Sequence, residues 1–254
     1  MDVKNVAAIV TGGASGLGGA TAAMLAAKGA KVTIFDVNEE LGNAHAAKIG
    51  GSFQKVDVTN EESVIAGLDA AQAANGVARI LINCAGIAHG GRVVSKGAAH
   101  PLAAYRRTIE INLIGTFSVL SQFAARLSSA GLEPVGEEQG VIISTASVAA
   151  YEGQIGQAAY SSSKGGIVGM TLPVARDLAQ FGIRVNAIAP GLFITPMMES
   201  LPIEVQKSLG ENTPFPKRLG TAAEYAMLVD AIITNPMING ETIRIDGAVR
   251  LAPR

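Results

Sequence analysis

The sequence has little of several residue types that would point to other classes of protein. Only one of its 254 residues is a cysteine, Cys84, so no disulfide bond can form within the chain. This is typical of a reducing compartment. Tryptophan is absent and aromatic residues make up only 4%, which predicts a core of aliphatic side chains. Charged residues make up 16% and the net charge is −1, so we expect no basic field that attracts nucleic acid.

Long apolar segments and targeting signals are also missing. No run of 18 or more apolar residues is present, whereas a membrane-spanning helix needs about 20. Asp2 stands where a signal peptide would carry basic residues, and the apolar run at 6–10 is too short for the apolar part of such a peptide. We therefore expect a soluble, cytoplasmic protein with no membrane partner. The hydrophobic content of 48% excludes an intrinsically disordered chain.

Short apolar runs alternate with longer alanine-rich segments. Seven runs favour buried strands, at 6–10, 31–35, 52–56, 79–83, 141–144, 184–189 and 242–245. Helices are indicated at 18–28, 60–74, 105–128 and 158–181. This alternation predicts an α/β fold, and strands that are apolar on both faces indicate that helices cover both sides of the sheet. We predict one Rossmann-type, doubly wound domain over residues 1–254 with a central parallel sheet, in which the proline-rich residues 192–218 cover the substrate.

A glycine-rich turn follows the first predicted strand. Residues 11–18 read Thr-Gly-Gly-Ala-Ser-Gly-Leu-Gly. Glycines allow a phosphate to approach the backbone, and the helix that begins here offers free N–H groups and the positive end of its dipole. The turn therefore predicts a site for the phosphates of a dinucleotide. The alternative is a tight turn that binds nothing.

Asp36 follows the second predicted strand, 18 residues after Gly18. A carboxylate in this place accepts hydrogen bonds from the ribose hydroxyls and repels a 2′-phosphate. None of Ala14, Ser15 and Val37 is basic. We therefore expect the cofactor to be NAD rather than NADP. The alternative is a solvated acid that caps the next turn.

Tyr160 and Lys164 are four residues apart, which places them on one face of a predicted helix. A nearby ammonium group favours a phenolate, so we expect Lys164 to lower the tyrosine pKa from about 10 and to let Tyr160 exchange a proton with a substrate oxygen. Ser147 comes just after the fifth predicted strand, where its hydroxyl can hold the same oxygen. Taken alone, the pair is a weak signal, because an amphipathic helix with a solvated lysine has the same spacing.

The combined pattern resembles the short-chain dehydrogenase/reductase family. Its parts occur in a fixed order, namely the turn at 11–18, Asn83-Cys84-Ala85-Gly86, Asn112, Ser147, Tyr160 with Lys164, and Pro190-Gly191. The resemblance extends over essentially the whole chain and implies an NAD-dependent oxidoreductase that interconverts a secondary alcohol and a ketone. It implies that Tyr160 is the acid/base and that Ser147 orients the substrate. It also implies that Lys164 binds the nicotinamide ribose, and that Asn112 completes a water network with Lys164.

The resemblance further implies a set of cofactor contacts. They are Gly12, Ser15, Gly16, Leu17 and Gly18 along the phosphates, Asp57 and Val58 beside the adenine, Cys84, Ala85 and Gly86 between the adenosine ribose and the nicotinamide, and Phe193 and Thr195, after Pro190 and Gly191, at the carboxamide.

Segments 144–154, 165–173 and 215–220 resemble one subgroup of the family, the type II 3-hydroxyacyl-CoA dehydrogenases. This implies a 3-hydroxyacyl-CoA as substrate, a role in fatty acid metabolism, and a homotetramer in which the helices at 105–128 and 158–181 pair between subunits. The alternatives are a 3-oxoacyl reductase, a hydroxysteroid or sugar-alcohol dehydrogenase, and, in a different class, a non-catalytic protein that senses dinucleotides or acts as a scaffold.

Other polar residues have plainer interpretations. Cys84 has no histidine or basic residue near it in the sequence, which favours a packed thiol over a nucleophile. The three histidines lack the spacing of metal ligands, so no metal is expected. Four basic residues are interpreted as solvated surface charges, namely Arg92, Lys96, Lys217 and Arg218. The alternative is that they contact the phosphates of CoA.

Overall fold

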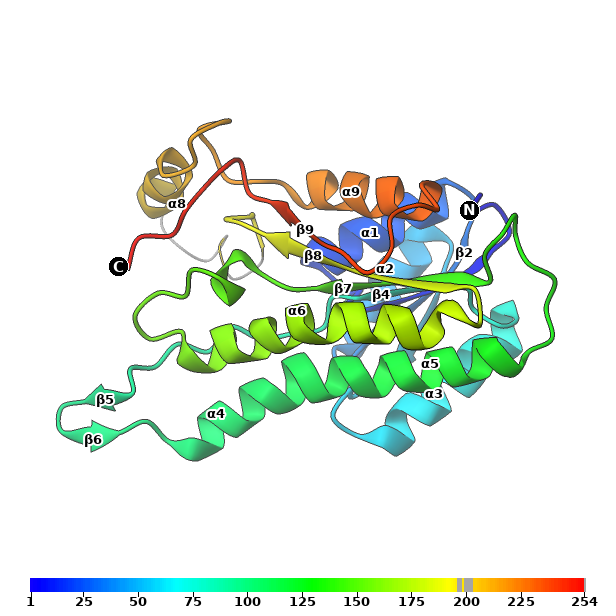
Figure 1. Ribbon diagram of the computed structural model, residues 1–254, viewed down its shortest axis with the longest axis horizontal. Helices are drawn as coiled ribbons and strands as arrows, with labels where there is room; N and C mark the ends of the chain where they lie inside the picture. The colour runs from blue at the N-terminus through cyan, green and yellow to red at the C-terminus, as the bar shows by residue number, and fades with distance from the viewer. Residues whose placement is uncertain (196–197, 199–202, 254) are drawn as a thin grey trace.

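A computed structural model of the chain describes residues 1–195, 198 and 203–253. Its centre, within these residues, is a parallel sheet of seven strands in the order β3-β2-β1-β4-β7-β8-β9 (Figure 1). The strands are β1 (Ala7–Thr11), β2 (Lys31–Asp36), β3 (Ser52–Lys55), β4 (Ile80–Asn83), β7 (Gly140–Thr145), β8 (Ile183–Pro190) and β9 (Thr242–Ile245). The predicted α/β fold class is confirmed.

The strand order reverses at the centre of the sheet. From β1 the chain moves outward to β2 and β3, then crosses back to β4 on the other side of β1. The register pairs Thr11 with Phe35 on one side and with Asn83 on the other. In sheets of this kind, ligands bind outside the carboxyl ends of the strands at the point of reversal.

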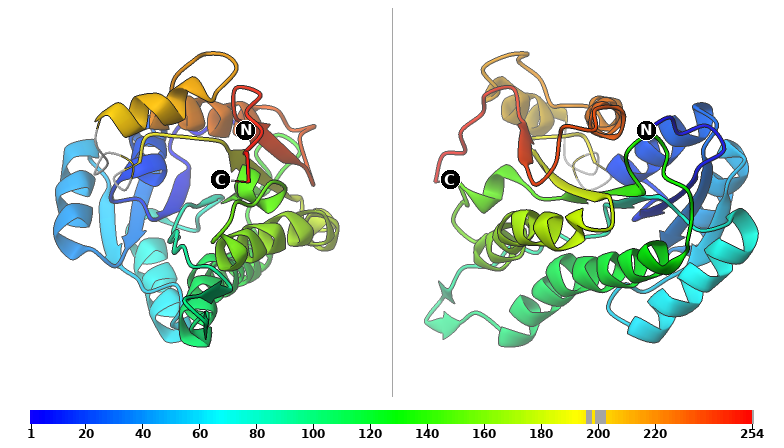
Figure 2. Two further views of the ribbon diagram at one scale, coloured as in Figure 1. Left: turned by 90° about the vertical axis from the view of Figure 1, so that its left-hand side faces the viewer. Right: turned by 45° about the vertical axis from the view of Figure 1, so that its right-hand side comes forward.

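Helices cover both faces of the sheet (Figures 1 and 2). One face carries α1 (Gly16–Ala27), α2 (Glu39–Ile49) and α9 (Ala222–Thr234), and the other carries α3 (Glu61–Asn75), α5 (Gly115–Ser129) and α6 (Ala158–Ala179). In β4, Ile80 and Ile82 pack on the side of α1 and α9, whereas Leu81 packs on the side of α3 and α5. Burial on both faces explains why the strands are continuous apolar runs.

The helix predicted at 105–128 is a composite. It comprises α4 (Leu102–Ile109), a π-helical turn (Glu110–Ile114) and α5, which follow one another without a break. Asn112 lies in the π turn and is fully buried. Such turns insert an extra residue and redirect a side chain, often at a functional site.

Several elements were not predicted. They are α2, α9, a short 3₁₀ helix (Val148–Ala150), α8 (Ile203–Glu211) and the antiparallel hairpin of β5 (Val94–Ser95) and β6 (Ala98–Ala99). The hairpin turns at Lys96 and Gly97, both with positive φ, and Lys-Gly is not one of the usual sequences for such a turn.

The segment predicted to cover the substrate, 192–218, contains α8, but residues 196–197 and 199–202 lie outside the described residues. In the part of the chain that is described, no helix combines the length and apolar character needed to cross a bilayer.

Candidate active site

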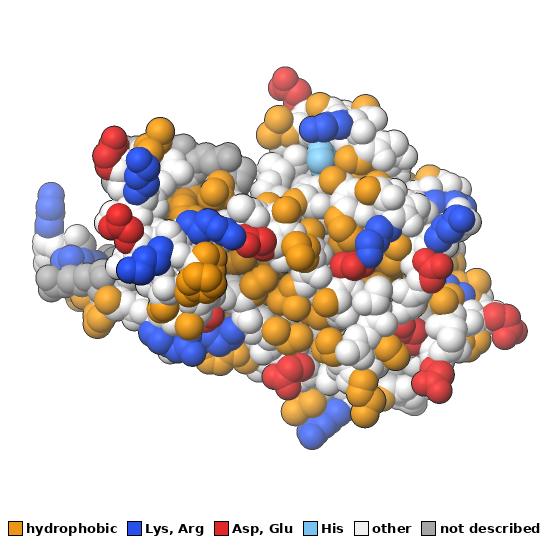
Figure 3. Space-filling model, turned by 90° about the horizontal axis from the view of Figure 1, so that it is seen from above, with side chains coloured by type: hydrophobic (Ala, Val, Ile, Leu, Met, Phe, Trp, Pro, Cys, Tyr) orange, Lys and Arg blue, Asp and Glu red, His pale blue; other side chains and the backbone are white. Residues whose placement is uncertain are grey.

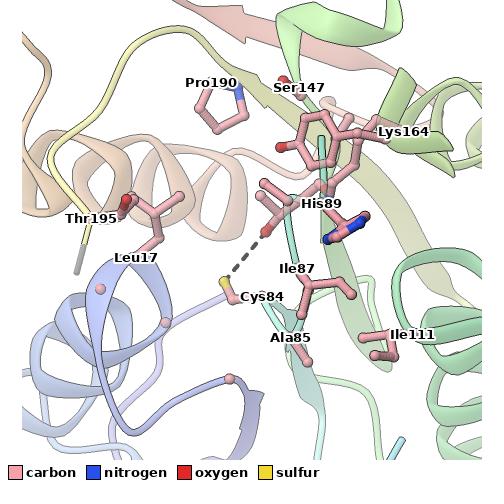
Figure 4. A pocket seen from close by; sticks show the side chains of 18 of the residues that line it. Leu17, Cys84, Ala85, Ile87, His89, Ile111, Ser147, Lys164, Pro190 and Thr195 are labelled. Carbon is pink, nitrogen blue, oxygen red and sulfur yellow. Dashed lines mark hydrogen bonds between the residues drawn. The ribbon is translucent and has the colours of Figure 1, made fainter. Parts of the chain in front are cut away.

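A cavity of about 860 Å³ opens where the strands end. Its wall contains the residues at or just after the ends of β1, β2, β4, β7 and β8, including Gly12, Asp36, Cys84, Thr145 and Pro190. Figure 4 shows Leu17 and Thr195 on one side of this space, with Ser147 and Lys164 across from them. The cavity therefore lies at the point where the strand order reverses.

The cavity brings together nearly all the residues singled out in the sequence. Its lining includes Gly12, Ser15, Gly16, Leu17, Gly18, Asp36, Asp57, Val58, Cys84, Ala85, Gly86, Ser147, Tyr160, Lys164, Pro190, Gly191, Phe193 and Thr195. Asn112 is not part of the lining. The cofactor contacts of these residues stay predictions, but all of those named for the cofactor face one space.

The glycine turn leaves the first turn of α1 open to an anion. Ser15 stands at the N-cap in an extended conformation, and its side chain makes no capping hydrogen bond. No acidic residue occupies the first turn. Gly12 and Gly16 have φ values of +62° and +56°, which suit glycine. The free N–H groups of this helix end are donors of the kind that phosphates accept.

Asp36 is held by two backbone N–H groups, one from the glycine turn and one from the residue two positions after it. One carboxylate oxygen accepts a hydrogen bond from the Ala14 N–H at 3.1 Å, and the other accepts from the Asn38 N–H at 3.0 Å. Neither bond uses all the lone pairs of its oxygen. Among the described residues, no cation forms an ion pair with Asp36, so its negative charge is available to ribose hydroxyls and opposes a phosphate.

Ser147, Tyr160 and Lys164 meet above the end of β7. Ser147 begins the 3₁₀ helix, where its hydroxyl accepts a hydrogen bond from the Ala149 N–H at 3.1 Å, and it also hydrogen-bonds to Tyr160. Helix α6 places Lys164 one turn after Tyr160, with its ammonium nitrogen 5.8 Å from the centre of the phenol ring. That nitrogen donates to the carbonyl oxygen of Thr145 at 2.6 Å.

The pKa values in this cluster differ from the expectation. Burial raises the pKa of Tyr160, and the hydrogen bond with Ser147 offsets only part of the rise. Burial also lowers the pKa of Lys164 to about 8. The predicted lowering of the tyrosine pKa by Lys164 is therefore not found: burial dominates the shift, and the contact that lowers the pKa is the one with Ser147.

Asn112 supports the cavity wall from behind. Its side-chain oxygen accepts from the Ile87 N–H at 2.8 Å, and its nitrogen donates to the Ile87 carbonyl at 2.9 Å and to the Ser163 hydroxyl at 3.0 Å. It thus fixes the backbone after β4. A methyl group at Gly86 would lie 3.1 Å from the Asn112 oxygen and 3.7 Å from the Lys164 nitrogen. The water network between Asn112 and Lys164 stays a prediction.

The Cys84 thiol is a packing group and not a nucleophile. Its sulfur lies 3.3 Å from the Thr145 hydroxyl oxygen and donates a hydrogen bond to the Tyr225 hydroxyl at 3.7 Å. The dashed line in Figure 4 joins the Cys84 sulfur to the Thr145 oxygen. Burial raises the pKa of the thiol, which disfavours the reactive thiolate.

Some lining residues were not foreseen from the sequence. They include Ile87, His89, Arg107, Gln154, Gln157 and Leu251. None belongs to a motif with its own spacing, and Leu251 comes from the far end of the chain. The Phe193 side chain packs into the core, so only its backbone is placed to contact a cofactor. Arg218, considered for CoA, instead pairs with Glu224 at 2.7 Å.

Comparison with known proteins agrees with this geometry. A profile described as short chain dehydrogenase matches residues 6–206. The chain belongs to the short-chain dehydrogenase family. It is therefore an oxidoreductase that interconverts alcohols and carbonyl compounds with a nicotinamide dinucleotide.

Relatives from distant organisms cover almost the whole chain. 3-Hydroxyacyl-CoA dehydrogenase type-2 of Homo sapiens is 52% identical over 99% of this chain and 97% of its own length. The protein of the same name from Drosophila melanogaster is 50% identical over 99% of this chain and 100% of its own length. The crystal structure of 3-hydroxyacyl-CoA dehydrogenase type-2 from Mycobacterium avium is 42% identical, with a TM-score of 0.92 and 98% of each chain covered.

Gly18→Ala tests the glycine turn. A methyl group at Gly18 would collide with the Gly12 carbonyl oxygen and lie 3.1 Å from the Cys84 side chain. The backbone of the turn must then shift away from the position that suits a phosphate, so we expect NADH to bind about tenfold more weakly, a loss of about 1.4 kcal/mol. A titration followed by NADH fluorescence measures this. Gly169→Ala on α6, where a methyl group meets nothing within 4 Å, serves as the control. Equal affinities for the two variants would contradict the prediction.

The buried Lys164 makes stability depend on pH. Its pKa is about 8 in the folded protein and near 10.5 when unperturbed. Between these values the unfolded chain binds more protons, so stability rises with pH. Below pH 8 the full penalty for the buried charge is present.

The comparison of wild type with Lys164→Met isolates this effect. We expect the wild-type free energy of unfolding, minus that of the variant, to rise from pH 8 to pH 10.5. Urea denaturation at fixed pH values measures the difference. A difference that stays constant or falls across this window would rule out a lowered pKa.

Proposed function

We propose that the protein catalyses the NAD-dependent interconversion of a 3-hydroxyacyl-CoA and a 3-oxoacyl-CoA. The observation that carries the proposal is the buried cluster of Ser147, Tyr160 and Lys164, which lines the same cavity as the glycine turn and Asp36. The substrate class rests on the relatives named 3-hydroxyacyl-CoA dehydrogenase type-2, which align with this chain almost from end to end.

The cluster is suited to moving a proton at an alcohol oxygen. In the oxidative direction, the Tyr160 phenolate takes the proton from the substrate hydroxyl as the carbon–hydrogen bond breaks and the carbonyl forms. The Ser147 hydroxyl donates a hydrogen bond to the same oxygen and holds it in place. NAD, when bound, supplies the acceptor for the hydride. The buried Lys164 provides positive charge one helical turn from the phenolate.

The residues along the other half of the cavity fit NAD. The uncapped start of α1 suits the two phosphates, and the Asp36 carboxylate suits a ribose with free hydroxyls. By the resemblance, Asp57 and Val58 flank the adenine, and the backbone from Pro190 to Thr195 holds the carboxamide. We propose that Lys164 also binds the nicotinamide ribose.

The surface offers positive charge to an anionic thioester. Viewed from the side of α9, several Lys and Arg side chains lie at the end of the molecule that carries α8, with some Asp and Glu side chains among them (Figure 3, left). Lys207 of α8 and Lys217, which follows this helix, are both exposed. Charge of this sign favours the approach of the CoA phosphates. We further propose that residues 192–218 cover the bound substrate within a single domain of residues 1–254.

The decisive test is the formation of NADH from NAD and a short-chain 3-hydroxyacyl-CoA, followed by absorbance. We expect turnover with the thioester and little with the free 3-hydroxy acid. No turnover with the thioester, while NADH still binds, would contradict the proposed substrate.

Tyr160→Phe tests the role of the phenol. We expect turnover to fall by about 10²–10⁴-fold, the usual share of acid–base catalysis, while NADH affinity stays near that of wild type. Tyr105→Phe on α4 is the matched control, because Tyr105 is not part of the cavity lining. If Tyr160→Phe keeps full activity, the proposed mechanism is wrong.

Asp36→Arg tests the choice of NAD. The substitution removes the charge that repels a 2′-phosphate and adds one that attracts it. We expect the ratio of kcat/KM for NADP to that for NAD to rise by about tenfold or more, since a charge-assisted hydrogen bond contributes about 1.5–3 kcal/mol. Glu40→Arg is the matched control, because it makes the same change of charge at a residue outside the cavity lining. An unchanged ratio in Asp36→Arg would refute the assignment.

We also propose a homotetramer. Large apolar side chains stay exposed on the composite helix, at Leu102, Ile114 and Phe117, and on or just after α6, at Leu172 and Phe181. These are the two helical segments that the resemblance pairs between subunits. Light scattering is expected to give the mass of four chains, and the mass of a single chain would contradict this proposal. The cytoplasmic location expected from the sequence stays a prediction.

A further inference from the structure

The cavity wall contains residues, close to Tyr160 along the chain, that the proposed mechanism does not use. Gln154 and Gln157 line the cavity from the loop at 151–157. This loop connects the 3₁₀ helix that begins after Ser147 with helix α6, which carries Tyr160. It therefore follows Ser147 and precedes Tyr160 in the chain, whereas the glycine turn and Asp36 follow β1 and β2.

The carboxyl-terminal segment 251–253 lies along this loop. The Ile155 N–H donates to the Pro253 carbonyl at 3.0 Å, and the Gln154 side-chain nitrogen donates to the Ala252 carbonyl at 2.9 Å. The Leu251 N–H donates to a carboxylate oxygen of Glu152 at 3.1 Å. Three successive residues are thus bonded to one loop, and Leu251 itself lines the cavity.

Ion pairs tie the same loop to the sheet. Glu152 pairs with Arg244 of β9 at 2.8 Å and with Arg250 at 3.3 Å. Asp246 pairs with the same two arginines, at 2.7 and 3.2 Å. Networks of several charges with bidentate geometry hold their members more firmly than isolated surface pairs do. The position of Leu251 is therefore set by the edge of the sheet as well as by the loop.

The loop is also bonded to the segment that follows β4. The Gly156 carbonyl accepts a hydrogen bond from the Gly91 N–H at 2.8 Å. Gly91 directly follows Ile87, Ala88, His89 and Gly90, which all line the cavity. Three segments far apart in the sequence, 87–91, 151–157 and 250–253, are thus joined around the reacting end.

We propose that Leu251 is a specificity-determining residue, which limits the size of the acyl group that fits beside Tyr160, and that Glu152 positions it. The proposal rests on the proposed function for the identity of the acyl group. An apolar side chain in the wall of a substrate pocket excludes longer chains by its volume. Discrimination by one methylene group in such a pocket reaches about 10–200-fold.

The test compares kcat/KM for 3-hydroxybutyryl-CoA and 3-hydroxydecanoyl-CoA in wild type, Leu251→Ala and Leu251→Phe. We expect the ratio of the long to the short substrate to rise by about tenfold in Leu251→Ala and to fall by a similar factor in Leu251→Phe. Glu152→Gln, which weakens the ion pairs, is expected to shift the ratio in the same direction as Leu251→Ala. NADH affinity, measured by fluorescence, should stay unchanged in all three variants.

Leu41→Ala is the matched control, because Leu41 is exposed on α2 and lies outside the cavity lining. A ratio that stays at the wild-type value in both Leu251 variants would overturn the proposal and leave the proposed function intact. If wild type oxidises neither thioester, the proposed function fails instead. The same ratio is then measured with secondary alcohols of increasing chain length, and an unchanged ratio there would overturn the role of Leu251.

Discussion

The site depends on how the end of β7 holds a buried lysine. The Thr145 carbonyl accepts a hydrogen bond from the Lys164 ammonium at 2.6 Å, while the Thr145 hydroxyl donates to the Asn83 carbonyl at 2.7 Å. The same hydroxyl lies 2.8 Å from the Tyr225 hydroxyl. An ammonium group away from water needs such partners, because an unpaired buried charge is very costly. Thr145 thus connects the lysine to β4, β7 and α9 at once.

Burial favours the uncharged form of both ionisable side chains in the cluster, Tyr160 and Lys164. It raises the pKa of Tyr160 and lowers that of Lys164. The phenolate that oxidation requires therefore has to be stabilised by specific contacts, and Ser147 supplies one that lowers the tyrosine pKa. Where burial removes water from a polar contact, the contact is stronger than it would be at the surface. The removal of water thus makes the charged forms of Tyr160 and Lys164 less stable and also strengthens the hydrogen bond from Ser147 that the phenolate needs.

Much of the fold and of the site could be predicted because local chemistry decides it. Apolar runs that are buried on both faces identify the strands, and the glycine turn and Asp36 follow strand ends that a parallel sheet gathers at one edge. The π turn at Asn112, the Lys-Gly hairpin turn and the position of Leu251 could not be predicted. They depend on contacts between distant segments, such as the bonds from Asn112 to Ile87. The pKa of Tyr160 was predicted in the wrong direction, because spacing along a helix carries no information on burial.

The π turn lets the composite helix hold one residue more than a regular helix of the same length. The extra residue is absorbed within one turn, so α4 and α5 keep nearly the rotational relation that they would have in an unbroken helix. If one residue between 110 and 114 were deleted, Arg107, which lines the cavity, and Thr108, which is buried, would therefore keep their surroundings. The extra residue thus serves the placement of Asn112 and not the orientation of α4.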